Sequence, residues 1–222
     1  MKNDNIIRFY ILANKLKNII RRGWVEIGIS KERLESDAEH IYGTLMLAIA
    51  INSEYELDLD MYKVLKMLAL HETEEIIMPD YTVRSNVTKE EKNRQGKDAV
   101  SKVVSGLACE NDIKKLLDDY RKRDSKEAKF AHLVDKIECD FQAKIYDLEG
   151  FMDYNKARED LIYYGTRAEE IDSKSKTAAD FWIEYDRPKY KDNKIFRELI
   201  DDIKNIDIKK YEELMNINIE GE

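Results

Sequence analysis

The sequence is poor in the residues that form turns, with only 2 prolines and 8 glycines among its 222 residues. A β-rich fold needs frequent turns, so this scarcity favours helices. Cysteine is also rare. Cys109 and Cys139 do not have the spacing of a CxxC motif, and we expect free thiols in a reducing compartment, the cytoplasm.

Long apolar runs and an excess of positive charge are missing as well. The longest uncharged stretch, residues 41–53, has 13 residues, which is too short to cross a bilayer, and the first residues lack the apolar core of a signal peptide. The formal net charge of −8 would repel a nucleic acid polymer. We therefore expect no membrane and no nucleic acid partner, whereas a small phosphorylated ligand could still bind in a local basic pocket.

Apolar residues recur at helical spacing along most of the chain. Helices are expected over residues 4–20, 37–53, 60–78, 88–107, 110–122 and 126–149, with three or four more after residue 153. Capping boxes at Ser36–Glu39 and Thr88–Glu91 mark two starts, and Pro79 should end the third helix. We predict an all-α fold in which residues 1–222 form a single domain, with a core of about 5–150 and accessory helices in 151–222 packed on it.

Three histidines lie beside or near carboxylates, in the pairs Glu39-His40 and His71-Glu72 and in the segment His132–Asp135. Imidazole and carboxylate ligands together suit Mn²⁺, Fe²⁺, Co²⁺, Ni²⁺ or Zn²⁺. Glu75 follows His71 by one helical turn, and Asp80 follows Pro79. Taken alone, these residues could also be a solvated, glutamate-rich helix end, because HETEE is not the HExxH motif of a zinc protease.

Several short motifs follow one another in a set order: Arg21-Arg22-Gly23-Trp24, Glu35–His40, Leu70–Ile76 with Pro79-Asp80, Thr88–Lys92 and His132–Lys136. Their order resembles that of the HD-domain metal-dependent phosphohydrolases, and most closely that of their 5′-deoxynucleotidase branch. Together the motifs span about residues 5–150. The resemblance implies a helical bundle with the site between its helices, and a homodimer.

The resemblance also implies roles for individual residues. The ligands of one divalent metal ion (Co, Mn, Fe, Ni, Zn or Mg) would be His40, His71, Glu72 and Asp135. Glu75 would handle protons, and Asp80 would position the nucleophilic water or the sugar. Substrate contacts would come from Arg21 or Arg22 on the phosphate, from Trp24 near the base or sugar, and from Lys136, which balances the charge of the site.

The implied activity is a divalent-metal-dependent release of phosphate from nucleoside 5′-monophosphates, with deoxyribonucleotides as substrates. One departure bears on it: Glu72 stands where the family has aspartate, and its extra methylene displaces the oxygens by about 1.5 Å. A nucleotide-binding or dimerisation module that has lost turnover is therefore an alternative. Another is a hydrolase of a different phosphorylated compound, such as a triphosphate, which would need a richer basic pocket with contributions from Arg84, Lys89 and Lys92.

Overall fold

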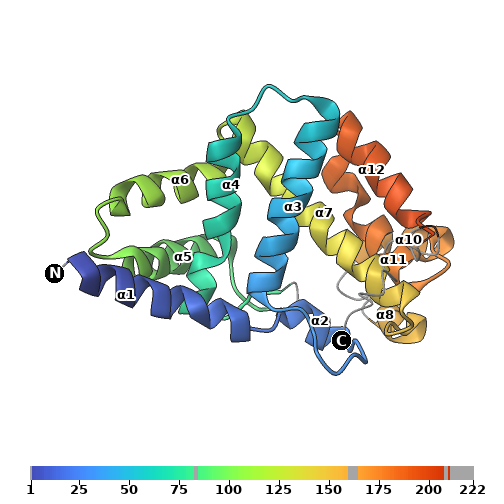
Figure 1. The fold of residues 1–222 in the computed structure, drawn as a ribbon. Coiled ribbons are helices and arrows are strands. Elements are labelled where there is room, and N and C mark those ends of the chain that lie inside the picture. Colours follow the sequence, from blue (N-terminus) through green and yellow to red (C-terminus); the bar gives the residue numbers. More distant parts are fainter. Residues whose placement is uncertain (1, 83–84, 160–164, 208–209, 211–222) are drawn as a thin grey trace, which may run out of the picture.

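The computed structural model describes residues 2–82, 85–159, 165–207 and 210, and in this part of the chain it contains no strand (Figure 1). The longer helices are α1 (Lys2–Ala13), α3 (Asp37–Tyr55), α4 (Met61–Leu70), α5 (Lys89–Val104), α6 (Glu110–Lys122), α7 (Lys126–Leu148), α11 (Ala178–Asp186) and α12 (Lys194–Lys204). Shorter ones are α2 (Arg22–Glu26), α8 (Tyr154–Glu159), α10 (Ala168–Lys174) and the 3₁₀ helices η1 (Asn14–Asn18), η2 (His71–Ile76), η3 (Gly165–Arg167) and η4 (Arg187–Tyr190). The all-α prediction is confirmed.

Helix α7 is the centre of the fold. It packs against α3, α4 and α6 on one side and against α11 and α12 on the other (Figure 1). The Ser125 side chain caps its first turn by accepting a hydrogen bond from the Ala128 amide. Gly150, whose φ of +81° suits glycine, follows its end, as predicted for a helix over 126–149.

The main hydrophobic core lies around α7 and draws side chains from both halves of the chain. Val134 and Ile137 of α7 are fully buried in it together with Met67 and Leu68 of α4. From α12, Phe196 packs edge-on against Phe130 of α7, with ring centroids 5.8 Å apart. Consequently α11 and α12 cover one side of α7, and α8 and α10 pack on α11.

The segment after α4 differs from the helix predicted through Met78. The α-helix ends at Leu70, whose φ of −120° leaves helical geometry, and a 3₁₀ helix continues to Ile76. Residues three apart eclipse one another in a 3₁₀ helix, so Glu72 and Glu75 come to the same side of η2. The Glu74 carboxylate, which lines the same pocket as these two, bonds Arg121 and lies over Gly96 of α5, where a Cβ would come within 2.4 Å of it.

The first predicted capping box is confirmed, whereas at the second only the Thr88 cap forms, because the Glu91 carboxylate accepts from Arg94 and Gln95. Ser36 and Glu39 form the reciprocal capping box of α3, and Thr88 accepts a hydrogen bond from the Glu91 amide at the start of α5. These caps fix where α3 and α5 begin, and both starts border the site described next. None of the described helices combines the length and the apolar character needed to cross a membrane.

Candidate metal centre and active site

Three elements bring together the four predicted metal ligands. His40 comes from the first turn of α3, His71 and Glu72 from η2, and Asp135 from the middle of α7. One donor atom from each residue lies within 4.8 Å of the others. All four side chains are buried or nearly so, although they are polar.

The hydrogen bonds behind the histidines fix which ring nitrogen faces the cluster. The His71 Nδ1 donates to the Leu68 carbonyl at 2.7 Å, because a carbonyl can only accept. His40 Nδ1 bonds the Glu138 carboxylate. The two Nε2 atoms are thereby turned toward one another at 3.3 Å.

This arrangement fits a divalent cation. Two Nε2 lone pairs at 3.3 Å repel unless a proton or a metal ion lies between them, and two carboxylates add negative charge. Asp135 Oδ1 lies 3.2 Å from His40 Nε2, and Glu72 Oε1 lies 3.3 Å from His71 Nε2. A mixed imidazole and carboxylate donor set is suited to Mn²⁺, Fe²⁺, Co²⁺, Ni²⁺ or Zn²⁺.

Without a metal, the cluster holds a proton on His40. Burial and the charge of Arg21 lower the pKa of His40, but its bonds to Asp135 and Glu138 outweigh them and raise it to about 9. Burial works against the charged form of Glu72, yet the neighbouring histidines and Arg21 hold its pKa well below the usual range. Burial also works against the charged form of Asp135, but the charge of Lys136 and the hydrogen bond to His40 outweigh it and hold the pKa of Asp135 well below the usual range. Both carboxylates are therefore charged and ready to bind a cation.

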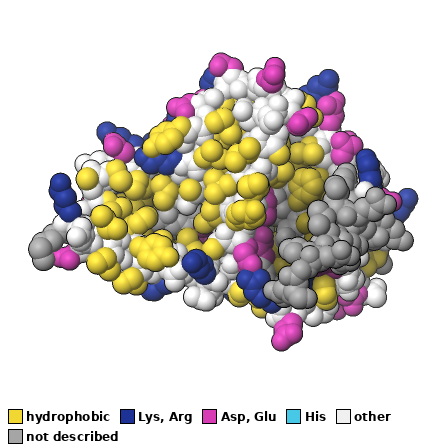
Figure 2. All heavy atoms as spheres, in the orientation of Figure 1, with side chains coloured by type: hydrophobic (Ala, Val, Ile, Leu, Met, Phe, Trp, Pro, Cys, Tyr) yellow, Lys and Arg dark blue, Asp and Glu magenta, His cyan; other side chains and the backbone are white. Residues whose placement is uncertain are grey.

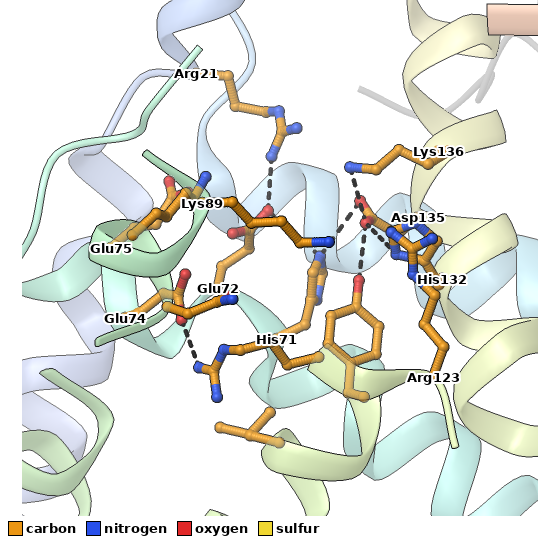
Figure 3. A pocket seen from close by; sticks show the side chains of 15 residues that line it. Arg21, His71, Glu72, Glu74, Glu75, Lys89, Arg123, His132, Asp135 and Lys136 are labelled. Carbon is orange, nitrogen blue, oxygen red and sulfur yellow. Dashed lines mark hydrogen bonds and ion pairs between the residues drawn. The ribbon is translucent and has the colours of Figure 1, made fainter. Parts of the chain in front are cut away.

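A pocket of about 310 Å³ opens over the cluster and has a basic rim. In Figure 3 the Arg21 guanidinium approaches Glu72 from one side, Lys136 approaches Asp135 from the other, and Lys89 reaches across between them. The corresponding distances are 2.9 Å from Arg21 Nη1 to Glu72 Oε1 and 3.1 Å from Lys136 Nζ to Asp135 Oδ2. The other cations that line the pocket are Lys92, Arg121 and Arg123. Arg84 lies outside the described residues.

Glu75 lines the same pocket and is the residue best suited to hold a proton there. Burial, followed by the charges of Glu72, Asp80 and Asp37, raises the pKa of Glu75 to about 11. Its Oε2 has no hydrogen-bond partner among the described residues. Glu75 is therefore a neutral carboxyl group at physiological pH, with an oxygen available to a ligand.

Four predicted site residues do not line the pocket itself: His40, which belongs to the cluster beneath it, and Arg22, Trp24 and Asp80. Arg22 points outward and pairs with Glu26 at 2.6 Å, while its backbone amide donates to Asp80 Oδ2 at 3.0 Å. Trp24 is only 3% exposed, because its ring packs against Tyr146 and Trp182 and its Nε1 donates to Glu35. Of the two adjacent arginines, only Arg21 reaches the pocket, and the Trp24 side chain belongs to the core.

The structure adds residues that the sequence did not single out. Glu138 is the bonding partner of His40, and Gly43 makes room for it, since a Cβ there would come within 2.3 Å of the Glu138 carboxylate. The Tyr120 hydroxyl donates to Asp135 Oδ2 at 2.8 Å. Glu138 lies one turn after Asp135, a spacing that would have drawn attention in a less acidic helix, whereas no sequence signal marks Tyr120.

Comparison with known proteins points to one family. A family model described as "HD domain" matches residues 13–179. The chain is 28% identical over 171 residues to a Dictyostelium discoideum protein named 5′-deoxynucleotidase HDDC2, covering 74% of this chain and 89% of that protein. It is 32% identical over 152 residues to the 5′-deoxynucleotidase hdd1 of Schizosaccharomyces pombe, covering 66% and 74%.

Solved structures agree in fold. A conserved hypothetical protein from Pyrococcus furiosus superposes with a TM-score of 0.61 at 23% identity, covering 90% of this chain and 99% of that one. An HD-domain phosphohydrolase from Listeria innocua superposes with a TM-score of 0.56 at 16% identity, covering 95% and 97%. At these identities the likeness concerns the fold alone.

The proton on His40 predicts how metal affinity depends on pH. A metal ion must displace this proton, so the apparent Kd should fall about tenfold per pH unit as pH rises, and should level off near the His40 pKa of about 9. Competition with a chromophoric chelator between pH 6 and pH 10 measures the dependence. Glu138→Gln removes a carboxylate that favours the charged ring and should move the levelling-off point to lower pH.

His132→Gln is the matched control for this experiment. Burial, then the charge of Lys136, lowers the pKa of His132 to about 3, so this histidine is neutral over the whole range and its replacement should leave the slope unchanged. An affinity independent of pH in the unmodified protein would contradict the assignment.

Proposed function

The chain belongs to the HD-domain family, and we propose that it is a divalent-metal-dependent phosphohydrolase that releases phosphate from nucleoside 5′-monophosphates, with deoxyribonucleotides as its substrates. The observation that carries the proposal is the pair of facing histidine Nε2 atoms, 3.3 Å apart, beneath a basic pocket. The names of the related 5′-deoxynucleotidases support the substrate class. A cytoplasmic location is part of the proposal and is supported by the two free thiols.

His40, His71, Glu72 and Asp135 would hold the metal ion, which supplies Lewis acidity when bound. Arg21 provides the fixed positive charge for the phosphate. Its Nη1 bonds Glu72, its Nη2 lies 3.4 Å from the Cys139 sulfur, and its Nε lies 3.8 Å from Glu35. A guanidinium held on three sides can stabilise charge that develops on the phosphoryl oxygens without having to reorganise.

Glu75 acts on the leaving group in this proposal. As water attacks phosphorus, the bond from phosphorus to the 5′ oxygen breaks, and that oxygen needs a proton. The neutral Glu75 carboxyl, which lines the pocket, donates the proton, and the proton released by the water returns to the site. Asp80, which accepts from the Arg22 amide and whose charge helps to raise the pKa of Glu75, orients water or sugar at this end of the site.

Trp24 contributes indirectly. Its Nε1 holds the Glu35 carboxylate at 2.8 Å, and Glu35 in turn lies against the Arg21 guanidinium. We therefore assign Trp24 to the positioning of Arg21 through Glu35, with Lys136 and Arg21 as the substrate contacts on opposite sides of the pocket.

Phosphate release from a panel of 5′-ribo- and deoxyribonucleotides tests the function. Chelator-stripped protein should be inactive and should regain activity with one or more of Co²⁺, Mn²⁺, Mg²⁺ and Ni²⁺. Glu72→Gln, which keeps the shape of the side chain and removes its charge, should lower kcat/KM about 100-fold or more. Glu90→Gln, an exposed position in the first turn of α5, is the control. No release from a folded, metal-binding protein would favour the binding-module alternative.

The two adjacent arginines make a second, internally matched test. Arg21→Lys retains the buried charge but loses the planar fork, and should lower kcat/KM by about 10- to 100-fold, with Arg21→Ala lower still. Arg22→Ala removes only a surface ion pair and should change kcat/KM by less than about threefold. Thermal unfolding verifies that each variant is folded. The reverse order of effects would show that Arg22 carries the phosphate.

We also propose that two copies of the chain associate through one apolar face. Figure 2 shows hydrophobic side chains spread over α1 and α3 on the same side of the molecule. The members of this face, each at least 48% exposed, are Ile6, Ile7, Tyr10, Ile11, Tyr42, Met46 and Ile49. Large exposed apolar patches on soluble proteins usually mark an interaction surface.

A charge placed in this face should separate the copies. Ile49→Glu should convert a dimer into the 26.2 kDa monomer, as measured by light scattering coupled to size-exclusion chromatography. Leu148→Glu, an exposed leucine at the end of α7, should leave the mass unchanged. A monomeric unmodified protein would contradict the proposal.

A further inference from the structure

A second cavity adjoins the active-site pocket. It has a volume of about 450 Å³, and its walls come from the end of α6, one face of α7 and the segment before α12. Its polar lining includes Arg123, Lys129, His132, Lys136, Lys189 and Asn193. Arg123, His132 and Lys136 line the active-site pocket as well, so the two spaces share a wall.

The charge of this cavity contrasts with that of the whole chain. Four cations and one carboxylate, Asp192, line it in a protein whose net charge is −8. Two of the cations are already paired, Lys136 with Asp135 at 3.1 Å and Lys189 with Asp186 at 2.5 Å. Arg123 and Lys129 have no side-chain ion pair among the described residues. Unpaired cations gathered in a concave surface raise the local concentration of an anion.

Three of the residues that line the cavity follow one face of α7. Lys129, His132 and Lys136 are spaced at i, i+3 and i+7 on α7, so they follow one face of the helix, over about 10 Å from end to end. Its Lys136 end touches the metal cluster through Asp135. At the far end, Asn193 uses its Oδ1 to cap α12 at the Phe196 amide, so its NH₂ group can donate to an anion.

We propose that this cavity binds a second phosphoryl group of the same nucleotide whose first phosphate lies over the metal cluster. The inference rests on the proposed function, and it extends the substrate class to nucleotides with two phosphoryl groups. In a 5′-diphosphate the second phosphorus is one bridging oxygen from the first and reaches only the Lys136 end. A 3′-phosphate is separated by the sugar, and the span of about 10 Å along α7 from Lys136 to Lys129 favours this group, held between Lys129 and Lys189.

Calorimetric titration of the metal-loaded full-length protein tests the proposal. The ligands are the 5′-monophosphate, the 5′-diphosphate and the 3′,5′-bisphosphate of one deoxyribonucleoside, at fixed ionic strength. Initial-rate KM values replace Kd for any ligand that is hydrolysed. The bisphosphate should bind about tenfold more tightly than the monophosphate, as expected for charge-assisted hydrogen bonds to one added phosphate.

Two double variants, each replacing two lysines by neutral glutamines, show whether the tighter binding of the bisphosphate depends on the cavity. Lys129→Gln with Lys189→Gln should abolish the bisphosphate advantage. Lys122→Gln with Lys126→Gln removes the same charge from lysines that are 56% exposed and paired with surface aspartates outside the cavity, and should preserve the advantage. An advantage of the diphosphate as large as that of the bisphosphate would contradict the assignment to a 3′-phosphate, because the second phosphate of the diphosphate reaches only the Lys136 end.

Equal binding of all three ligands, or an advantage that survives the Lys129 and Lys189 substitutions, would overturn the proposal. The outcome is separable from that of the proposed function. Titration needs no turnover, so a protein that releases no phosphate can still show the second subsite, and an active nucleotidase can lack it.

Discussion

The two histidines that face each other at 3.3 Å are the constraint on which the site depends. Neither ring can turn away, because the Leu68 carbonyl holds His71 and the Glu138 carboxylate holds His40. The fold maintains this arrangement by joining α3, η2 and α7 at one point of the core. Two nitrogen lone pairs that face each other in a buried cluster repel. The folded chain therefore requires a cation between them, either a proton or a metal ion.

A second constraint is the balance of buried charge around that point. Asp37 is fully buried with no partner for its carboxyl oxygens among the described residues, and burial, followed by the Glu72 charge, raises its pKa to about 7. Glu35 is raised to about the same value, first by burial and then by Glu138. Arg21 is the partly buried cation that offsets these carboxylates, which explains why it points inward while Arg22 lies at the surface. The residue that stabilises the fold here is also the one available to a phosphate.

Much of the fold and of the candidate site was predictable from the sequence, because the motifs that mark them are local. The Ser36 and Thr88 caps, the Ser125 start of α7 and the histidine–carboxylate pairs each occupy a few adjacent residues, and the order of the motifs indicated that they meet. The burial of Trp24 was not predictable, because a tryptophan two residues after an arginine suits a ligand wall and a core equally. Its partners, Tyr146 and Trp182, are far away in the sequence. Tyr120 was missed for the same reason, since only tertiary packing brings it to the cluster. Glu138 was missed because other carboxylates in α7 hide its spacing from Asp135.

The change from α- to 3₁₀-helix at His71 explains how the Glu72 carboxylate comes to line the pocket. In the shorter turn Glu72 eclipses Glu75, and both line the pocket. Glu72 reaches back toward its neighbour, with Oε1 3.3 Å from His71 Nε2, and the same oxygen accepts from Arg21. If the proposed metal ion is bound, this oxygen would face the ion and the guanidinium together, and the guanidinium would withdraw electron density from it and weaken it as a ligand. In the proposed site the extra methylene would therefore bear on the choice of metal more than on the assembly of the site, because a weaker carboxylate donor would leave the two imidazoles as the stronger ligands.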